Sequence, residues 1–417
     1  MINFAPTSGN GGTLSLTAGS AAAGNLQANL ALSANGGAAG NGGTINITYN
    51  DASNSLLIGA SGANSYISGN ISVTAPGAGN GGTINITNTA AGALTTTLTS
   101  TLSTSGTNNG SINFTSTSGQ AISVTGGGGL TGTINNNSTA AAVTYAVGTG
   151  NLVLGNISNA SGNITATNNA VSGSINTTAN IIGASGLTLT TASAGNIVLN
   201  NSILGSSVAL SAGGSGTITQ TSGIVIGTTS TTFTSGSGAI GSLNISTPHW
   251  TANTTGNVTL VNGQATTGNG ISTGANISFT DTVSAGNIAI TNNITTTGIL
   301  TLTSGTNGSV TIATGITASG ATITFNTPSL TLTGNGAVIA SASDVNILSN
   351  GASNALAVTL GSTGAITANV GNIAFNSSGS TGAITINSGN GALSANGGSG
   401  TIIFNGGSGV IDISTKQ

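Results

Sequence analysis

Apolar and polar residues alternate along many short segments of the chain, and each segment begins near a glycine. The nonapeptide GNGGTINIT occurs at 40–48 and again, unchanged, at 79–87, and a close relative, GNGGTLSLT, occupies 9–17. A period of two is typical of a strand with one buried face. The pattern therefore predicts strands whose Ile, Leu, Val or Phe side chains point inward and whose Thr, Asn and Ser side chains point outward.

Shorter versions of the same pattern continue to the end of the chain. Examples are GSINF at 110–114, GLTLT at 186–190, GNIVL at 195–199, GNVTL at 256–260, GNIAI at 286–290, GNIAF at 371–375 and GAITI at 382–386. Self-similar strands at even spacing, two to a coil of roughly 20 residues, predict a parallel β-helix, or β-solenoid, of about 20 coils. Like residues on successive coils should then form hydrogen-bonded ladders.

We expect a single β-solenoid over residues 1–417. Before about residue 150 the exact motifs lie further apart, which predicts longer loops in 1–150 and a more regular remainder in 151–417. Glycine at the entry to each strand is expected to allow a corner with positive φ. Five phenylalanines at the ends of strand motifs are predicted to fill the core: Phe114, Phe279, Phe325, Phe375 and Phe404.

The composition supports an all-β fold with an apolar core. Hydrophobic residues make up 37% of the chain, and glycine occurs 70 times among abundant Thr, Ser and Asn. Thr, Ile and Val favour strands, while Gly and Asn favour the turns between them. Because the strong helix formers Glu, Lys, Arg and Gln are nearly missing, long helices are not expected.

Charge is almost absent, which excludes whole classes of function. Charged residues account for 1% of the chain, against about a quarter in an ordinary soluble domain. They are Asp51, Asp281, Asp344, Asp412 and Lys416. Enzymatic acid–base chemistry and cofactor binding are not expected from so few groups, and nucleic-acid binding needs clusters of Lys and Arg. No apolar run approaches the roughly 18 residues of a spanning helix, so membrane insertion is not expected either.

The motif GGSG, found at 213–216, 397–400 and 406–409, is similar to the start of a calcium-binding repeat. In such repeats an aspartate stands two residues after the motif, where this chain has Ile218, Ile402 and Ile411. Calcium needs several oxygen ligands, mostly carboxylates. No metal site is therefore predicted.

His249 and Trp250 form the most individual spot in the sequence, within STPHWTANTTGNVTL. They are the candidate ligand contact, because an exposed Trp250 could stack against a sugar ring. The favoured alternative is that Pro248 interrupts the coil and the pair closes a local loop.

The motifs resemble those of large bacterial surface exoproteins, the filamentous-haemagglutinin-like proteins and autotransporter passenger domains, whose repeats read G-[NTS]-[IVL]-x-[ILVF]. This resemblance covers nearly the whole chain. It implies a right-handed parallel β-helix, export to the bacterial cell surface, and roles in adhesion or matrix building. The first residues, MINFAPTSGNGG, lack the basic stretch and apolar core of a signal peptide, so we expect either that another part directs export or that the chain is a segment of a larger protein.

The leading hypothesis is a structural extracellular protein that assembles with itself, coil on coil, into a fibre, sheath or surface stalk. It rests on the repeat and on strand-like sequence near both ends, where solenoids normally carry a polar cap. One alternative is an adhesin that binds glycans or neighbouring cells through Trp250 and the loops of the first third. A third hypothesis is an ice-binding solenoid, motivated by outward threonines in runs such as 187–191 and 330–333.

Overall fold

A computed structural model describes residues 1–18, 26–51, 53–62, 65–91, 93–116, 120–136, 142–159, 162–351, 355–377, 382–387, 389–396, 399–406 and 409–414. It divides into two compact units, Met1–Gly223 (unit 1) and Ile224–Gln417 (unit 2). The described residues contain strands and no helix, and successive strands pair in parallel. The predicted all-β parallel β-helix is thus confirmed as a fold class. Its handedness, its number of coils and its continuity over 1–417 stay predictions, and Lys416 lies outside the described residues.

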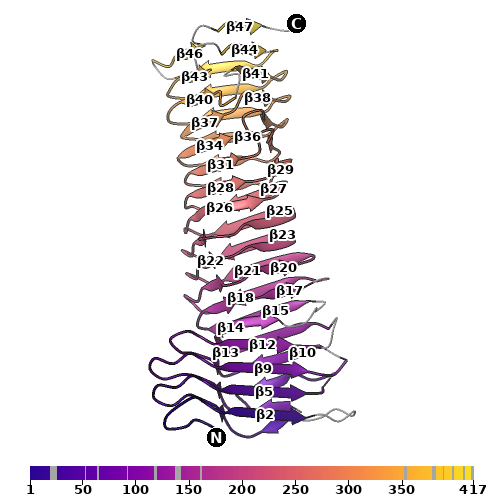
Figure 1. Cartoon of the computed structure of the whole chain (residues 1–417). Coiled ribbons are helices and arrows are strands. Elements are labelled where there is room, and N and C mark those ends of the chain that lie inside the picture. Colours follow the sequence, from indigo (N-terminus) through magenta and orange to yellow (C-terminus); the bar gives the residue numbers. More distant parts are fainter. Residues whose placement is uncertain are drawn as a thin grey trace. The chain divides into compact units, whose positions relative to one another are not determined.

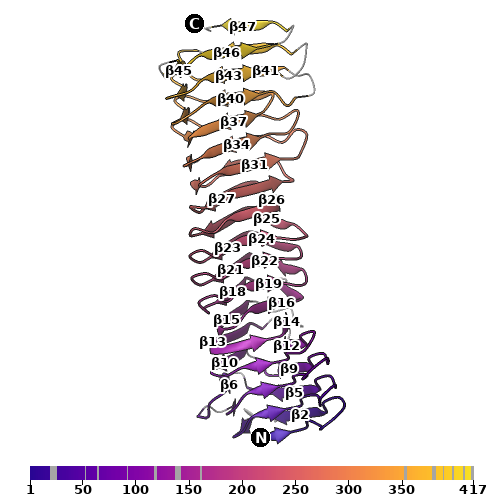
Figure 2. The same cartoon turned by 90° about the vertical axis from the view of Figure 1, so that its left-hand side faces the viewer.

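Unit 1 consists of three stacks of parallel strands, two of which are labelled side by side in Figure 2. The first stack contains β2 (Thr13–Ala18), β5 (Thr44–Tyr49), β9 (Thr83–Asn88), β12 (Ser111–Thr115), β14 (Thr133–Asn136), β16 (Leu152–Leu154), β19 (Ile175–Thr177), β22 (Ile197–Leu199) and β24 (Ile218–Gln220). The second contains β3 (Gln27–Ala28), β7 (Ser65–Ile67), β6 (Leu56–Ile58), β10 (Leu94–Leu98), β13 (Ile122–Thr131), β15 (Val143–Thr149), β18 (Ile164–Asn168), β21 (Gly186–Thr191) and β23 (Ile203–Ala212). Short strands form the third: β1 (Ile2–Asn3), β4 (Leu32–Ser33), β8 (Ile71–Ser72) and β11 (Leu102–Ser103), then β17 (Ile157–Asn159) and β20 (Ile181–Gly183).

Unit 2 has the same plan, and Figure 1 shows its strands stacked one on the next. After β25 (Val225–Ser235), its first stack contains β26 (Ile240–Ser246), β28 (Val258–Asn262), β31 (Ile277–Asp281), β34 (Ile299–Thr303), β37 (Thr322–Asn326), β40 (Val345–Leu348), β43 (Ile373–Asn376) and β46 (Ile402–Asn405). The second contains β27 (His249–Asn253), β29 (Gly268–Asn269), β30 (Ser272–Gly274), β33 (Ile294–Thr296), β36 (Thr317–Gly320), β39 (Ala337–Ala340), β42 (Ala365–Ala368) and β45 (Ala392–Ala395). The third contains β32 (Ile288–Ile290), β35 (Val310–Ile312), β38 (Ser329–Leu332), β41 (Leu356–Leu360), β44 (Ile384–Asn387) and β47 (Ile411–Ser414).

A coil therefore carries up to three strands, where the sequence predicted two. In unit 2 the missed strands are those of the second stack, because β30 buries Ser272 and Gly274 and β33 buries Thr296, so neither shows a pair of large apolar residues. Coil length also varies more than a fixed period allows. Partners on adjacent coils lie 31, 39 and 28 residues apart early in unit 1, 19 and 23 apart in the middle of unit 2, and 28 and 29 apart near its end.

The period-two pattern places the core as predicted. In β5 and β9 the isoleucines are fully buried and the intervening Thr and Asn are partly exposed. Four of the five predicted core phenylalanines, Phe114, Phe279, Phe325 and Phe375, are completely buried. Phe404 is only partly buried, with its ring stacked 5.1 Å from that of Phe375.

Apart from Gly9, whose φ is +88°, the glycines of the three GNGG motifs lack the positive φ expected of them, and they serve another purpose. The glycine after the asparagine lies against a backbone carbonyl of the next coil, so a Cβ on Gly81 would lie 1.7 Å from the oxygen of Thr104. That oxygen accepts a hydrogen bond from the nitrogen of Gly110 at 2.7 Å. Gly42 meets the carbonyl of Val73 in the same way, at 2.0 Å. Glycine is needed here because two backbones touch, and any side chain would separate them.

The two asparagines of the motif form two separate ladders. Within the strands, side-chain amides bond from coil to coil: Asn46 donates to Ser15 at 3.2 Å, Asn85 to Asn46 at 2.8 Å, Asn113 to Asn85 at 2.8 Å and Asn135 to Asn113 at 2.9 Å. The predicted ladders are thus confirmed.

The second ladder lies in the turns before these strands. The side-chain oxygen of Asn10 accepts a bond from the backbone nitrogen of Asn41 at 2.9 Å, and that of Asn41 accepts from the nitrogen of Asn80 at 2.8 Å. The amide of Asn108 then donates to Asn80 at 2.8 Å. One motif therefore supplies the backbone contact and both ladders.

Replacing Gly81 by alanine should lower the free energy of unfolding by about 1–3 kcal/mol, because the new methyl group collides with the Thr104 carbonyl. Gly127→Ala is the control, since a Cβ there meets no atom within 4 Å. Chemical unfolding followed by circular dichroism measures both. Equal stability of the two variants would contradict the role assigned to Gly81.

Tyr145→Phe should raise the free energy of unfolding by about 1 kcal/mol. The Tyr145 hydroxyl is buried with no hydrogen-bond partner among the described residues, and burial raises its pKa. Tyr49→Phe is the matched control, because that hydroxyl donates to the carbonyl of Thr95 at 3.4 Å. The control should show no gain in the same unfolding experiment, and a loss of stability in Tyr145→Phe would refute the argument.

Candidate functional site

The residues that the structure describes include four aspartates and one histidine as potential reactive or metal-binding side chains. Among them, no group of three or more His, Cys, Asp or Glu side chains gathers where it could hold a metal ion. In the same part of the chain, no helix is long and apolar enough to cross a membrane. Candidate sites must therefore be sought among single residues and neutral surfaces.

Three of the four aspartates are placed in local or exposed settings. The Oδ1 atom of Asp51 accepts a bond from the nitrogen of Ser53 at 2.9 Å, which closes a turn. Asp344 accepts from the nitrogen of Asn372 on the next coil at 2.7 Å. Asp412 is exposed on β47. Asp51 is thus buried in its own turn, while Asp344 is partly exposed and Asp412 lies at the surface.

Asp51 and Asp281 are both only 2% exposed, but Asp281 differs because one of its buried carboxyl oxygens lacks a hydrogen-bond partner among the described residues. It stands at the end of β31 in register with Asn262, where an amide bonds to the surrounding turn. Its Oδ1 accepts from the nitrogen of Val283 at 3.0 Å, while Oδ2 has no partner among the described residues. Burial raises the pKa of Asp281 to about 6, and the backbone bond from Val283 only partly opposes this. The carboxyl group of Asp281 thus stands in register with the amide of Asn262, which both donates and accepts hydrogen bonds in its turn.

The candidate pair is divided between surface and core. His249 is exposed, with Nε2 3.3 Å from the hydroxyl of Thr267. Trp250 is completely buried, and its ring stacks on Phe279 at a centroid distance of 4.6 Å and an angle of 12°. An indole in this position has no face open to a sugar ring, so its contribution is to core packing. The sequence did not reveal the burial of Trp250, because the local alternation does not show that Phe279 packs against its ring.

Pro248 does not end the strand pairing at this spot. His249 and Trp250 begin β27 and pair with Gly268 and Asn269. The expectation of a loop at the pair is therefore wrong, because the backbone hydrogen bonds of the coil resume directly after the proline.

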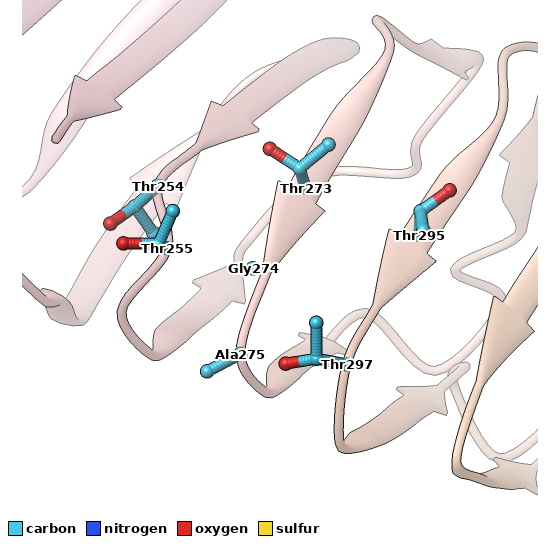
Figure 3. A pocket seen from close by; sticks show the side chains of 7 residues that line it. All are labelled: Thr254, Thr255, Thr273, Gly274, Ala275, Thr295 and Thr297. Carbon is cyan, nitrogen blue, oxygen red and sulfur yellow. The ribbon is translucent and has the colours of Figure 1, made fainter. Parts of the chain in front are cut away.

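A depression of about 360 Å³ lies on unit 2 near the ends of β30 and β33 (Figure 3). Its lining residues are Thr254, Thr255, Thr273, Gly274, Ala275, Thr295 and Thr297. Figure 3 shows Thr273 and Thr295 on neighbouring strands, and the register pairs them directly. The Thr254 hydroxyl is already bonded, donating to the carbonyl of Gly238 at 2.6 Å. The depression offers methyl groups and hydroxyls, with no charge or aromatic ring to orient a ligand.

No family model, no curated protein and no solved structure matches the chain. The resemblance to filamentous-haemagglutinin-like and autotransporter proteins therefore stays a prediction from the repeat motifs.

Asp281→Asn should remove a pH dependence that the low charge of the chain did not lead us to expect. Because the folded-state pKa is raised from 3.8 to about 6, the parent protein should be most stable below about pH 4 and lose stability as the pH rises to about 6. Above that, the amide variant should be more stable by about 1–3 kcal/mol. Unfolding can be followed by the fluorescence of Trp250, since its ring stacks on Phe279, which lies in the same strand as Asp281.

Asp412→Asn is the control for this experiment, because its carboxylate is exposed. It should keep the pH profile of the parent protein. A flat profile for the parent between pH 4 and pH 6 would show that Asp281 is not held in this environment.

Proposed function

We propose that this protein is a structural, extracellular β-solenoid that assembles end to end into a fibre, sheath or surface stalk. The observation that carries the proposal is the exposure of inward-facing side chains in the last described strands. Ile402, Ile411 and Ile413 are 39%, 45% and 54% exposed. Their partners one coil earlier, Ile373, Ile384 and Ile386, are completely buried.

A further coil in the same parallel register would bury these side chains. A second copy of the chain can supply such a coil, because its strands carry the same period-two pattern and the same spacing between paired strands. β46 and β47 also present backbone groups that an added strand can pair with. Backbone pairing and apolar burial together would hold the copies end to end.

The neutral surface supports the same proposal. Net charge is −3 over 417 residues, so copies can approach without strong electrostatic repulsion. A location at the bacterial cell surface rests on the resemblance of the motifs alone. The adhesin alternative has less support, because Trp250 is buried and the depression in unit 2 has neither charge nor aromatic rings.

Changing both Ile411 and Ile413 to lysine should prevent end-to-end assembly, since two charges would be placed where the next coil must pack. Electron microscopy and sedimentation velocity at high protein concentration should show filaments for the parent chain and single particles for the variant. The control changes Thr359 and Thr385 to lysine, which adds the same charge to outward positions of β41 and β44.

The control should form filaments like those of the parent. Single particles for the parent chain at every concentration would overturn the proposal. Filaments of equal length in both variants would show that the interface between copies does not include Ile411 and Ile413 of β47.

A further inference from the structure

The second stack of unit 1 carries two columns of threonines on its outer face. β10, β18 and β21 each present a Thr-x-Thr pair: Thr95 with Thr97, Thr165 with Thr167, and Thr188 with Thr190. The register aligns Thr165 with Thr188 and Thr167 with Thr190. The intervening strands β13 and β15 and the following β23 have Thr, Ser or Ala at the same two positions. Pairs that look irregular along the sequence become two straight columns on the folded chain.

Most of these hydroxyls are free to bind water. Thr97 bonds to the hydroxyl of Ser55 at 2.9 Å, but the side chains of Thr165, Thr167, Thr188 and Thr190 have no partner among the described residues. All four are partly exposed. Because threonine is branched at Cβ and held in a strand, its hydroxyl and methyl groups have few orientations to lose on binding. The columns are therefore a preorganised array.

The spacing of the array is set by the backbone. Successive rungs are about 4.8 Å apart, and the two columns are separated by two residues of strand, about 6.6 Å. These two repeats approach the oxygen spacings on a prism face of ice. Waters held in the trough between the columns can bond to hydroxyls on both sides, while the methyl groups leave the remaining water–water bonds undisturbed.

Charge does not interfere with such ordering on unit 1. Asp51 is the only charged side chain in its sequence, and it is 2% exposed. From β10 to β23 the outer positions of the two columns carry no aromatic ring, the kind of group that stacks on sugars, since Tyr145 points into the core. Tyr66, on the outer face of β7, continues the line of the second column beyond Leu57 and lies outside the threonine pairs. An ordered lattice of water fits this face better than a saccharide does.

We propose that the paired threonine columns of unit 1 bind ice. The first stack is the natural comparison, because its central column is asparagine and those amides bond to one another rather than to solvent. The proposal is independent of end-to-end assembly, which concerns the last strands of unit 2.

The test measures thermal hysteresis and ice-crystal shape for the full chain, with Thr165 and Thr188 both changed to tyrosine. The parent should give faceted crystals and a hysteresis that grows with concentration, and the variant should lose at least fivefold of that hysteresis. The control changes Thr44 and Thr83, a register pair on the first stack, to tyrosine and should keep it. Circular dichroism confirms that all three chains are folded.

Three outcomes would overturn the proposal. The parent chain has no hysteresis at millimolar concentration, or the two variants lose activity equally. Alternatively, the parent binds crystalline cellulose or chitin, the Thr165 and Thr188 variant does not, and hysteresis is absent, which would make the face a saccharide-binding surface.

Discussion

Parallel pairing of each coil with the next is the constraint on which the rest of this structure depends. Every rung must meet its neighbour at the fixed spacing of a β-sheet, about 4.8 Å. Where the chain turns between faces, that spacing brings backbone against backbone, and glycine is required. Gly42 and Gly81 show this most directly, because a Cβ on either would overlap a carbonyl oxygen. The repeated GNGG motif is therefore a consequence of coil spacing.

The same constraint accounts for the lack of charge. In a register of like on like, a charged residue at a repeated outward position would face the same charge on both neighbouring coils, which destabilises a sheet. Neutral side chains that both donate and accept hydrogen bonds can repeat without this cost, as Asn46, Asn85 and Asn113 do. Asp281 illustrates the exception: a carboxylate in register with the amide of Asn262 is buried with one oxygen unpaired, and its pKa rises.

In the part of the chain that the structure describes, both proposals rest on extended surfaces rather than on a cluster of reactive side chains. These surfaces are regular, because the same distances between side chains recur along each strand and from one coil to the next. The uncovered inward side chains of the last strands suit another coil, and the threonine columns suit a lattice with matching repeats. Both depend on many weak, identical contacts, so neither produces the concentrated polar cluster by which an enzyme site is recognised.

The sequence by itself determined the fold class, because a period of two places Ile84 and Ile86 inward whatever surrounds them. It also determined the ladders, since an exact repeat puts Asn85 beside Asn46. Coil lengths and the second-stack strands of unit 2 were decided by tertiary packing, because variable turns and small or polar inward residues leave little periodic signal. The position of Trp250 was likewise decided by Phe279 on the next coil, a contact that local pattern cannot contain. Register between distant segments turned scattered Thr-x-Thr pairs into columns, because alignment across coils depends on every loop length between them.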